Sequence, residues 1–170
     1  MCKKGCCNIK ISPFKWEKEW TKEESSGFKA GVFIFDSSTN RILLVQSCGF
    51  LWGPPKGSVK KGETIMDGAI REVKEETGIE LDPEQLVGIT PVYLKKKSYY
   101  YILDMKEQKV SVQKTPNNDA NGITWININC LQSLRQKNGR YVMTKHSKII
   151  IEKVFGIKML DRCVSCPIFT

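Results

Sequence analysis

Three glutamates, Glu72, Glu75 and Glu76, stand three and four residues apart in a segment with the pattern of a helix. At these spacings their carboxylates project from one side of the helix. Like charges this close repel each other, so the cluster destabilises the chain unless a cation or a basic partner neutralises it. Oxygen ligands in this number suit Mg²⁺ or Mn²⁺. The cluster therefore predicts a divalent metal site, and an ordinary solvated helix face is the alternative.

The scarcity of histidine narrows the possible chemistry further. His146 is the only histidine in the sequence, which excludes a site that needs two imidazoles. A nucleophile activated by histidine would depend on this one residue, so we expect His146 to lie at the surface or at the start of a helix, where it can hydrogen-bond phosphate. Seven cysteines do not make a complete disulfide framework, and reduced thiols are expected.

The charge distribution places an acidic segment inside a basic protein. The formal net charge is +9, yet residues 63–80 carry six acidic and two basic side chains. Residues 95–114 carry six basic and two acidic side chains, and residues 135–162 carry eight and two. A metal on the acidic segment and a polyanionic substrate on the basic surface would account for both. A solvated helix between basic ends is the alternative.

Size and composition indicate one globular domain. The chain has 170 residues, of which 41% are hydrophobic and 26% charged, as is typical of a folded soluble protein. No apolar run approaches the roughly 18 residues of a bilayer span. The basic N-terminus lacks the apolar stretch of a secretory signal, so an intracellular, cytoplasmic location is expected.

The segments before the glutamates predict a β-hairpin followed by a loop. Residues 28–35 and 42–46 are rich in β-formers and flank a polar turn at 36–40. The sequence WGPPKG at 52–57 contains two prolines and two glycines, which break regular structure, so a loop is expected there.

The glutamates themselves fall in a helix expected over 64–77. Thr64 is a suitable N-cap, and Gly78 is a suitable stop. Further elements follow along the chain, as strands near 87–94, 99–103 and 123–126 and as a closing helix over 145–155. This order predicts an α/β fold, with helices packed on a mixed central sheet.

The stretch GSVKKGETIMDGAIREVKEETGI at 57–79 fills every defined position of the Nudix box. The chain therefore resembles the Nudix hydrolases, and this resemblance implies their α/β/α sandwich. We expect the Nudix hydrolase domain to occupy residues 27–160, after an N-terminal arm over 1–26 and before a cysteine-containing tail over 161–170. The positions that carry the resemblance are Gly57, Glu63, Arg71, Glu72, Val73, Glu75, Glu76, Gly78 and Ile79.

The resemblance implies hydrolysis of a nucleoside diphosphate linked to another group, with Mg²⁺ or Mn²⁺ as cofactor and water as the nucleophile. By position, the three glutamates match the catalytic, metal-binding acids of the family. The backbone carbonyl of Gly57 matches its usual additional metal ligand. Arg71 and Glu63 match the supporting pair that positions the acids.

Asp119 is a further candidate catalytic acid outside the box. It begins the pattern acid, apolar, any two residues, apolar, any residue, Trp. Several Nudix branches have this pattern, in which the acid precedes a strand. Aspartate stands where glutamate is commoner, and its side chain is shorter. Proton abstraction, a water-mediated role and metal binding therefore remain open, with an ordinary turn residue as the alternative.

The substrate is suggested by the WGPPKG segment, which resembles the corresponding loop of mRNA-decapping Nudix enzymes. Related PKG loops occur in diadenosine tetraphosphate hydrolases and diphosphoinositol polyphosphate phosphohydrolases, and in all three Lys56 would point toward phosphate. Lys95, Lys97 and Tyr99, in the sequence KKKSYYY, favour RNA, because lysines bind phosphate and a tyrosine face can stack a base.

Decapping of mRNA, with release of 7-methylguanosine diphosphate, is the leading prediction. The alternatives are a diphosphoinositol polyphosphate or diadenosine tetraphosphate hydrolase, and a Nudix-fold binding module without catalysis. The expected partners are thus capped RNA or a polyphosphorylated small molecule.

Overall fold

The computed structural model describes residues 8–11, 24–47, 51–113, 120–133 and 143–156. None of the helices among these residues is long and apolar enough to cross a membrane. The elements are β1 (Asn8–Ile11), β2 (Ser25–Asp36), β3 (Arg41–Ser47), β4 (Leu51–Gly53), β5 (Lys56–Lys60), α1 (Ile65–Thr77), the 3-10 helix η1 (Pro83–Leu86), β6 (Val92–Leu94), β7 (Ser98–Asp104), β8 (Ala120–Asn127), the 3-10 helix η2 (Ile128–Ser133) and α2 (Lys145–Phe155).

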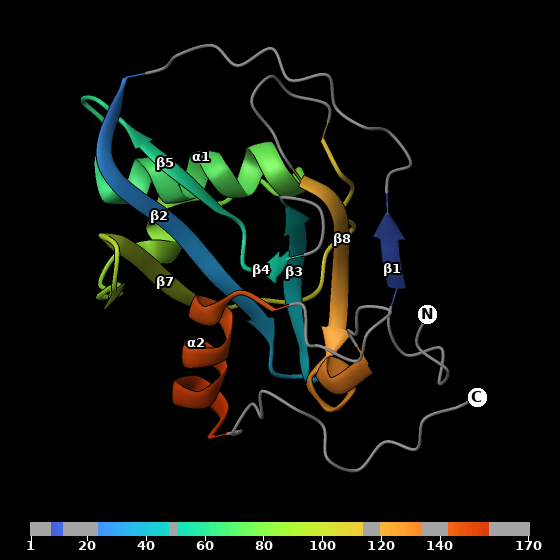
Figure 1. Ribbon diagram of the computed structural model, residues 1–170. Helices are drawn as coiled ribbons and strands as arrows, with labels where there is room; N and C mark the ends of the chain where they lie inside the picture. Colours follow the sequence, from blue (N-terminus) through green and yellow to red (C-terminus); the bar gives the residue numbers. More distant parts are fainter. Residues whose placement is uncertain (1–7, 12–23, 48–50, 114–119, 134–142, 157–170) are drawn as a thin grey trace.

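The described strands form one twisted sheet (Figure 1). Its order is β1-β8-β3-β2-β7-β6, with β4 paired to β3 and β5 paired to β2. Strands β2 and β7 pair in parallel, whereas the other paired strands are antiparallel. The prediction of an α/β fold with a mixed central sheet is therefore confirmed.

The two α-helices cover opposite faces of this sheet (Figure 1). Side chains alternate along β2, so Val32 and Ile34 join the core on the α1 side, and Phe33 between them joins the core on the α2 side. Val73 is buried on α1, and Ile150 is buried on α2. The sheet is thus buried on both faces, as in a sandwich of helices and strands.

Helix α1 begins and ends where the local sequence predicts. The Thr64 hydroxyl accepts the backbone N–H of Asp67 at 3.1 Å, and the Asp67 carboxylate accepts the backbone N–H of Thr64 at 3.4 Å. This reciprocal pair is a capping box. Gly78 takes a left-handed conformation, with φ of 77°, and its N–H donates to the Lys74 carbonyl.

The loop prediction for 52–57 was wrong in part. Trp52 and Gly53 lie in β4, and Lys56 and Gly57 begin β5. The two prolines stand between these strands, where a missing N–H removes no ladder hydrogen bond. The segment therefore crosses between two short strands instead of leaving the sheet.

Two further differences concern the ends of the sheet. The strand expected near 87–94 is confined to β6, because Gly88 has a φ of 79° and Pro91 has no N–H to donate, so residues 87–91 do not continue a ladder. Strand β1, inside the segment interpreted as an N-terminal arm, pairs with β8 and was not predicted. Its partner is more than 100 residues away in sequence, so no local pattern indicates it.

Candidate active site

The start of β5 lies against two of the three box glutamates. A Cβ atom at Gly57 would overlap the carboxyl group of Glu72, so only glycine leaves room for this side chain. One strand residue earlier, the backbone N–H of Lys56 donates to the Glu76 carboxylate at 2.9 Å. Helix α1 therefore presents Glu72 and Glu76 to the backbone of the WGPPKG segment.

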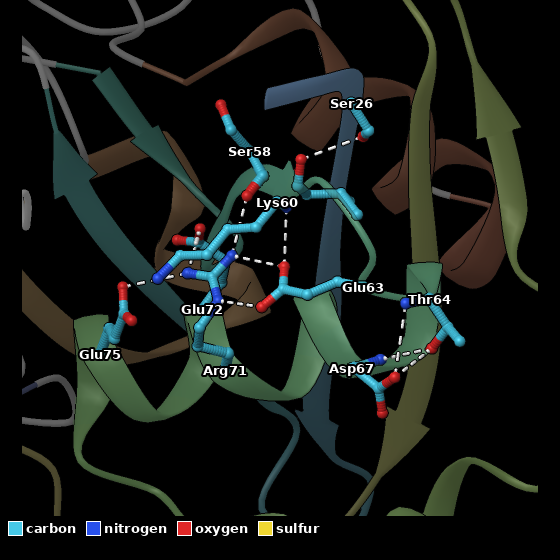
Figure 2. A network of polar contacts seen from close by, with 10 residues as sticks. Ser26, Ser58, Lys60, Glu63, Thr64, Asp67, Arg71, Glu72 and Glu75 are labelled. Carbon is cyan, nitrogen blue, oxygen red and sulfur yellow. Dashed lines mark hydrogen bonds and ion pairs between the residues drawn. The ribbon is translucent and has the colours of Figure 1, made fainter. Parts of the chain in front are cut away.

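Arg71 connects the acids to one another (Figure 2). Its Nε and Nη2 atoms bind both carboxylate oxygens of Glu63, at 2.7 and 3.1 Å. Its Nη1 atom bridges Glu72 at 2.8 Å and Glu75 at 3.1 Å. A fifth hydrogen bond, from Nη2 to the Ser58 carbonyl at 2.8 Å, fixes the guanidinium against β5. A single cation thus holds three carboxylates in a defined arrangement.

Burial sets the charge balance of this network. Burial raises the pKa of Glu72 to about 7, while the neighbouring Arg71 acts in the opposite direction. The hydrogen bond from Arg71 lowers the pKa of Glu63. Although its own burial opposes the shift, the pKa of Arg71 is raised by its bonds to Glu63 and Glu72. Burial therefore disfavours the ionised form of Glu72, and a nearby cation would stabilise it.

The donor atoms at this site fit a divalent metal ion in their chemistry. Carboxylate oxygens and a backbone carbonyl are the ligands that Mg²⁺ and Mn²⁺ prefer. Within the part of the chain that the structure describes, no three acidic, histidine or cysteine side chains are already gathered as metal ligands. Arg71 and the Lys56 N–H each bind these carboxylates through one oxygen. A carboxylate has about four lone-pair sites, so the glutamates can bind a metal while they keep these partners.

The residues predicted to bind substrate lie in three places. Tyr99 lies between two other rings, with centroid distances of 5.9 Å to Phe28 and 5.0 Å to Tyr93. Lys97 joins the same cluster, because its Nζ is 5.4 Å from the centre of the Phe28 ring. Lys95 instead lines a cavity beside the start of α2. Lys56 lies beside the glutamates, because its backbone N–H binds Glu76.

One candidate lies outside the described residues, and one residue has surroundings that the sequence did not indicate. The structure does not describe Asp119. His146 is the second residue of α2, as expected of a helix-start residue, but it is half-buried and its Nδ1 is 3.1 Å from the Tyr100 hydroxyl. The two residues are 46 positions apart, so no local spacing could have predicted this contact.

Carboxylates that can hold a divalent metal suit the metal-assisted hydrolysis of phosphate compounds. Comparison with known proteins gives the family, because residues 26–146 match the NUDIX domain. The chain belongs to the Nudix family and is a Nudix hydrolase.

Relatives of this chain include hydrolases from a virus, a plant and a yeast. The hydrolase-named protein 111R of Invertebrate iridescent virus 3 is 34% identical over 138 residues, which is 76% of this chain and 77% of that protein. Nudix hydrolase 5 of Arabidopsis thaliana is 22% identical over 69% of this chain and 49% of its own length. The m7GpppN-mRNA hydrolase of Saccharomyces cerevisiae is 35% identical over 43% of this chain, but over 9% of its own length.

Solved structures agree with the fold. The NUDIX domain of Shewanella oneidensis NrtR, complexed with ADP ribose, has a TM-score of 0.57 at 14% identity and covers 81% of this chain and 89% of its own. The dihydroneopterin triphosphate pyrophosphohydrolase of E. coli has a TM-score of 0.55 at 20% identity and covers 78% and 97%. At these identities the similarity concerns the fold alone.

Proposed function

We propose that this Nudix hydrolase is a pyrophosphohydrolase that removes the 5′ cap of mRNA and releases 7-methylguanosine diphosphate. The observation that carries the hydrolytic part is the arrangement of the box glutamates around Arg71 and beside Gly57. The choice of capped RNA is supported by the similarity to the yeast m7GpppN-mRNA hydrolase and by the lysines near the site.

The roles proposed for the box residues are those that the Nudix box implies, and their contacts agree with these roles. Glu72, Glu75, Glu76 and the Gly57 carbonyl hold Mg²⁺ or Mn²⁺, which, when bound, neutralises phosphate oxygens and acidifies a water molecule. Arg71 positions the glutamates through the bonds that Figure 2 shows. Glu63 in turn binds Arg71 through both carboxylate oxygens and accepts the Lys60 N–H at 2.8 Å.

The remaining roles concern the proton and the substrate. Asp119 is proposed to accept the proton of the attacking water, or to bind the metal. Lys56 supplies positive charge for the substrate phosphates beside the glutamates, and Lys95, Lys97 and Tyr99 contact the rest of the substrate.

A hydrolysis assay with three substrates tests this function. Capped RNA, a diphosphoinositol polyphosphate and diadenosine tetraphosphate are offered side by side with Mg²⁺ or Mn²⁺. Release of 7-methylguanosine diphosphate from capped RNA, without turnover of the small substrates, is the expected result. Faster hydrolysis of either small substrate would mean that this substrate, and not capped RNA, is the substrate of the enzyme. No turnover of any substrate, with metal bound, would identify a binding module.

The variant Glu76→Gln provides the first prediction and the blank for this assay. The substitution removes a charged metal ligand but keeps an acceptor for the Lys56 N–H, so the fold should persist while turnover falls at least about 100-fold. Activity and thermal unfolding are measured together. Glu84→Gln, on the exposed η1 helix, makes the same change in net charge and should remain fully active. Normal turnover in Glu76→Gln would mean that the metal site is elsewhere.

A further inference from the structure

A cavity of about 670 Å³ lies between the β6–β7 turn and the start of α2. This volume is within the range of roughly 300–1,000 Å³ that small-molecule sites occupy. None of the site residues predicted from the sequence lines it except Lys95. The cavity is therefore a second feature to explain beside the glutamates.

Basic side chains surround one part of this cavity. Lys95 and Lys96 reach it from the β6–β7 turn, and Lys145 reaches it from the first residue of α2. No acidic residue occurs among the described residues that line it. The first turn of α2 adds the partial positive charge of a helix N-terminus. This part of the cavity therefore attracts an anion.

Apolar side chains form the other part. Leu94 is buried, Ile149 is half-buried, and Tyr93 is 57% exposed and stands beside Tyr99. A densely phosphorylated inositol offers no apolar face to such a wall. A nucleobase does, because its ring can stack on tyrosine while its phosphates reach lysine. The combination of the two walls favours a nucleotide.

His146 fixes the geometry between the two walls. Its Nδ1 lies 3.1 Å from the hydroxyl of buried Tyr100 on β7, and the two rings meet edge to face. Burial lowers the pKa of His146, and the charges of Lys56 and Lys96 lower it further. The hydrogen bond between His146 and Tyr100 ties the start of α2 to the sheet.

The cavity is also connected to the glutamate site. The Thr144 N–H donates to the Trp52 carbonyl at 2.8 Å, which holds the start of α2 against the WGPPKG segment. In the same segment, the Lys56 backbone contacts Glu76, while the charge of the Lys56 side chain acts on His146. The cavity and the glutamates therefore both adjoin the WGPPKG segment.

We propose that this cavity binds a nucleoside of the substrate together with its adjoining phosphate, with Tyr93 and Ile149 against the base and Lys96 and Lys145 on the phosphate. This inference rests on the proposed function, because it identifies where the same substrate places its nucleoside. It distinguishes nucleotide substrates, such as a cap or a dinucleoside polyphosphate, from inositol polyphosphates.

Equilibrium titration with GDP in the presence of EDTA tests the anion wall without any turnover. Lys145→Glu reverses one charge at the cavity, and an acid in the first turn also suits the helix dipole. Lys153→Glu makes the same charge change on the exposed last turn of α2, outside the cavity. GDP binding should weaken roughly 3- to 10-fold in Lys145→Glu and stay near that of the unmodified protein in Lys153→Glu. Equal affinities in the two variants would overturn the proposal.

A second pair of variants tests the apolar wall. Tyr93→Ser removes the exposed ring, and Val87→Ser removes an exposed apolar side chain that does not line the cavity. Tyr93→Ser should weaken GDP binding by roughly 5- to 50-fold and leave binding of inositol hexakisphosphate unchanged. GDP binding that is indifferent to Tyr93, or an equal loss for both ligands, would overturn the nucleoside assignment.

These titrations are independent of the hydrolysis assay. They contain no divalent metal, so a protein that fails to hydrolyse any substrate can still show the expected loss of GDP binding. If the protein hydrolyses capped RNA but its affinity for GDP does not change in the Lys145 and Tyr93 variants, the proposed function stands. Only the assignment of the cavity is then wrong.

Discussion

Arg71 carries an unusual share of the candidate site, because one guanidinium holds three carboxylates and a backbone carbonyl. The contacts use Nε and both terminal nitrogens, which diverge in the fixed plane of the group. A lysine has the same charge but a single nitrogen, so it cannot reach Glu63 and the helix glutamates together. The position depends on the shape of the cation as much as on its charge.

Arg71→Lys should therefore lower kcat by roughly 10- to 100-fold, as is typical when the partner that orients a metal ligand is lost. The measurement is steady-state hydrolysis together with thermal unfolding. Arg41→Lys is a matched control, because Arg41 forms an ion pair with Glu107 in which the two atoms are 2.6 Å apart. This pair is not part of the box, so the substitution should leave kcat unchanged. Equal losses of activity in the two variants would show that Arg71 acts on the fold and does not position the acids.

Among the elements, the β2–β3 hairpin is held by one buried carboxylate. Asp36 accepts hydrogen bonds from the Ser38 hydroxyl at 2.5 Å, from the backbone N–H groups of Ser38 and Thr39, and from the Glu107 N–H at 2.8 Å. These bonds, the Ser38 hydroxyl first, lower the pKa of Asp36 from 3.8 to about 2. The charged form is thus favoured in the folded state, and it stabilises the fold above about pH 4.

Asp36→Asn should destabilise the protein by about 1–3 kcal/mol at pH 7, because the amide NH₂ cannot accept the Glu107 N–H. The advantage of the unmodified protein should shrink as the pH falls from about 4 toward 2, where Asp36 takes up its proton. Urea unfolding of both proteins at a series of pH values measures this difference. A difference that stays constant down to pH 2 would mean that the charge of Asp36 does not contribute.

The elements also show which parts of the structure a sequence can predict. Helix α1 was predicted with both ends because Thr64 and Gly78 act within one turn of it. The box glutamates were found by their helical spacing, and the family resemblance supplied the expected roles of Glu63 and Arg71. Strand β1 and the contact of His146 with Tyr100 depend on distant partners, so neither periodicity nor capping indicates them.

At the scale of the whole molecule, the binding of RNA to the basic surface should weaken as the salt concentration rises. Each lysine that contacts RNA phosphate releases counterions, which gives single-stranded RNA binding a slope of about −0.7 per contact in a plot of log affinity against log salt. If Lys95, Lys96 and Lys97 each contact one phosphate, the slope is about −2, and a fourfold rise in salt weakens binding roughly 20-fold. Fluorescence anisotropy of labelled capped RNA with the Glu76→Gln protein measures this slope. Lys97→Gln should make it shallower by about 0.7, whereas Lys153→Gln should not change it. An affinity for capped RNA that does not change with salt would mean that these lysines do not contact RNA phosphate. A small polyphosphate would then be the remaining candidate ligand of the basic surface.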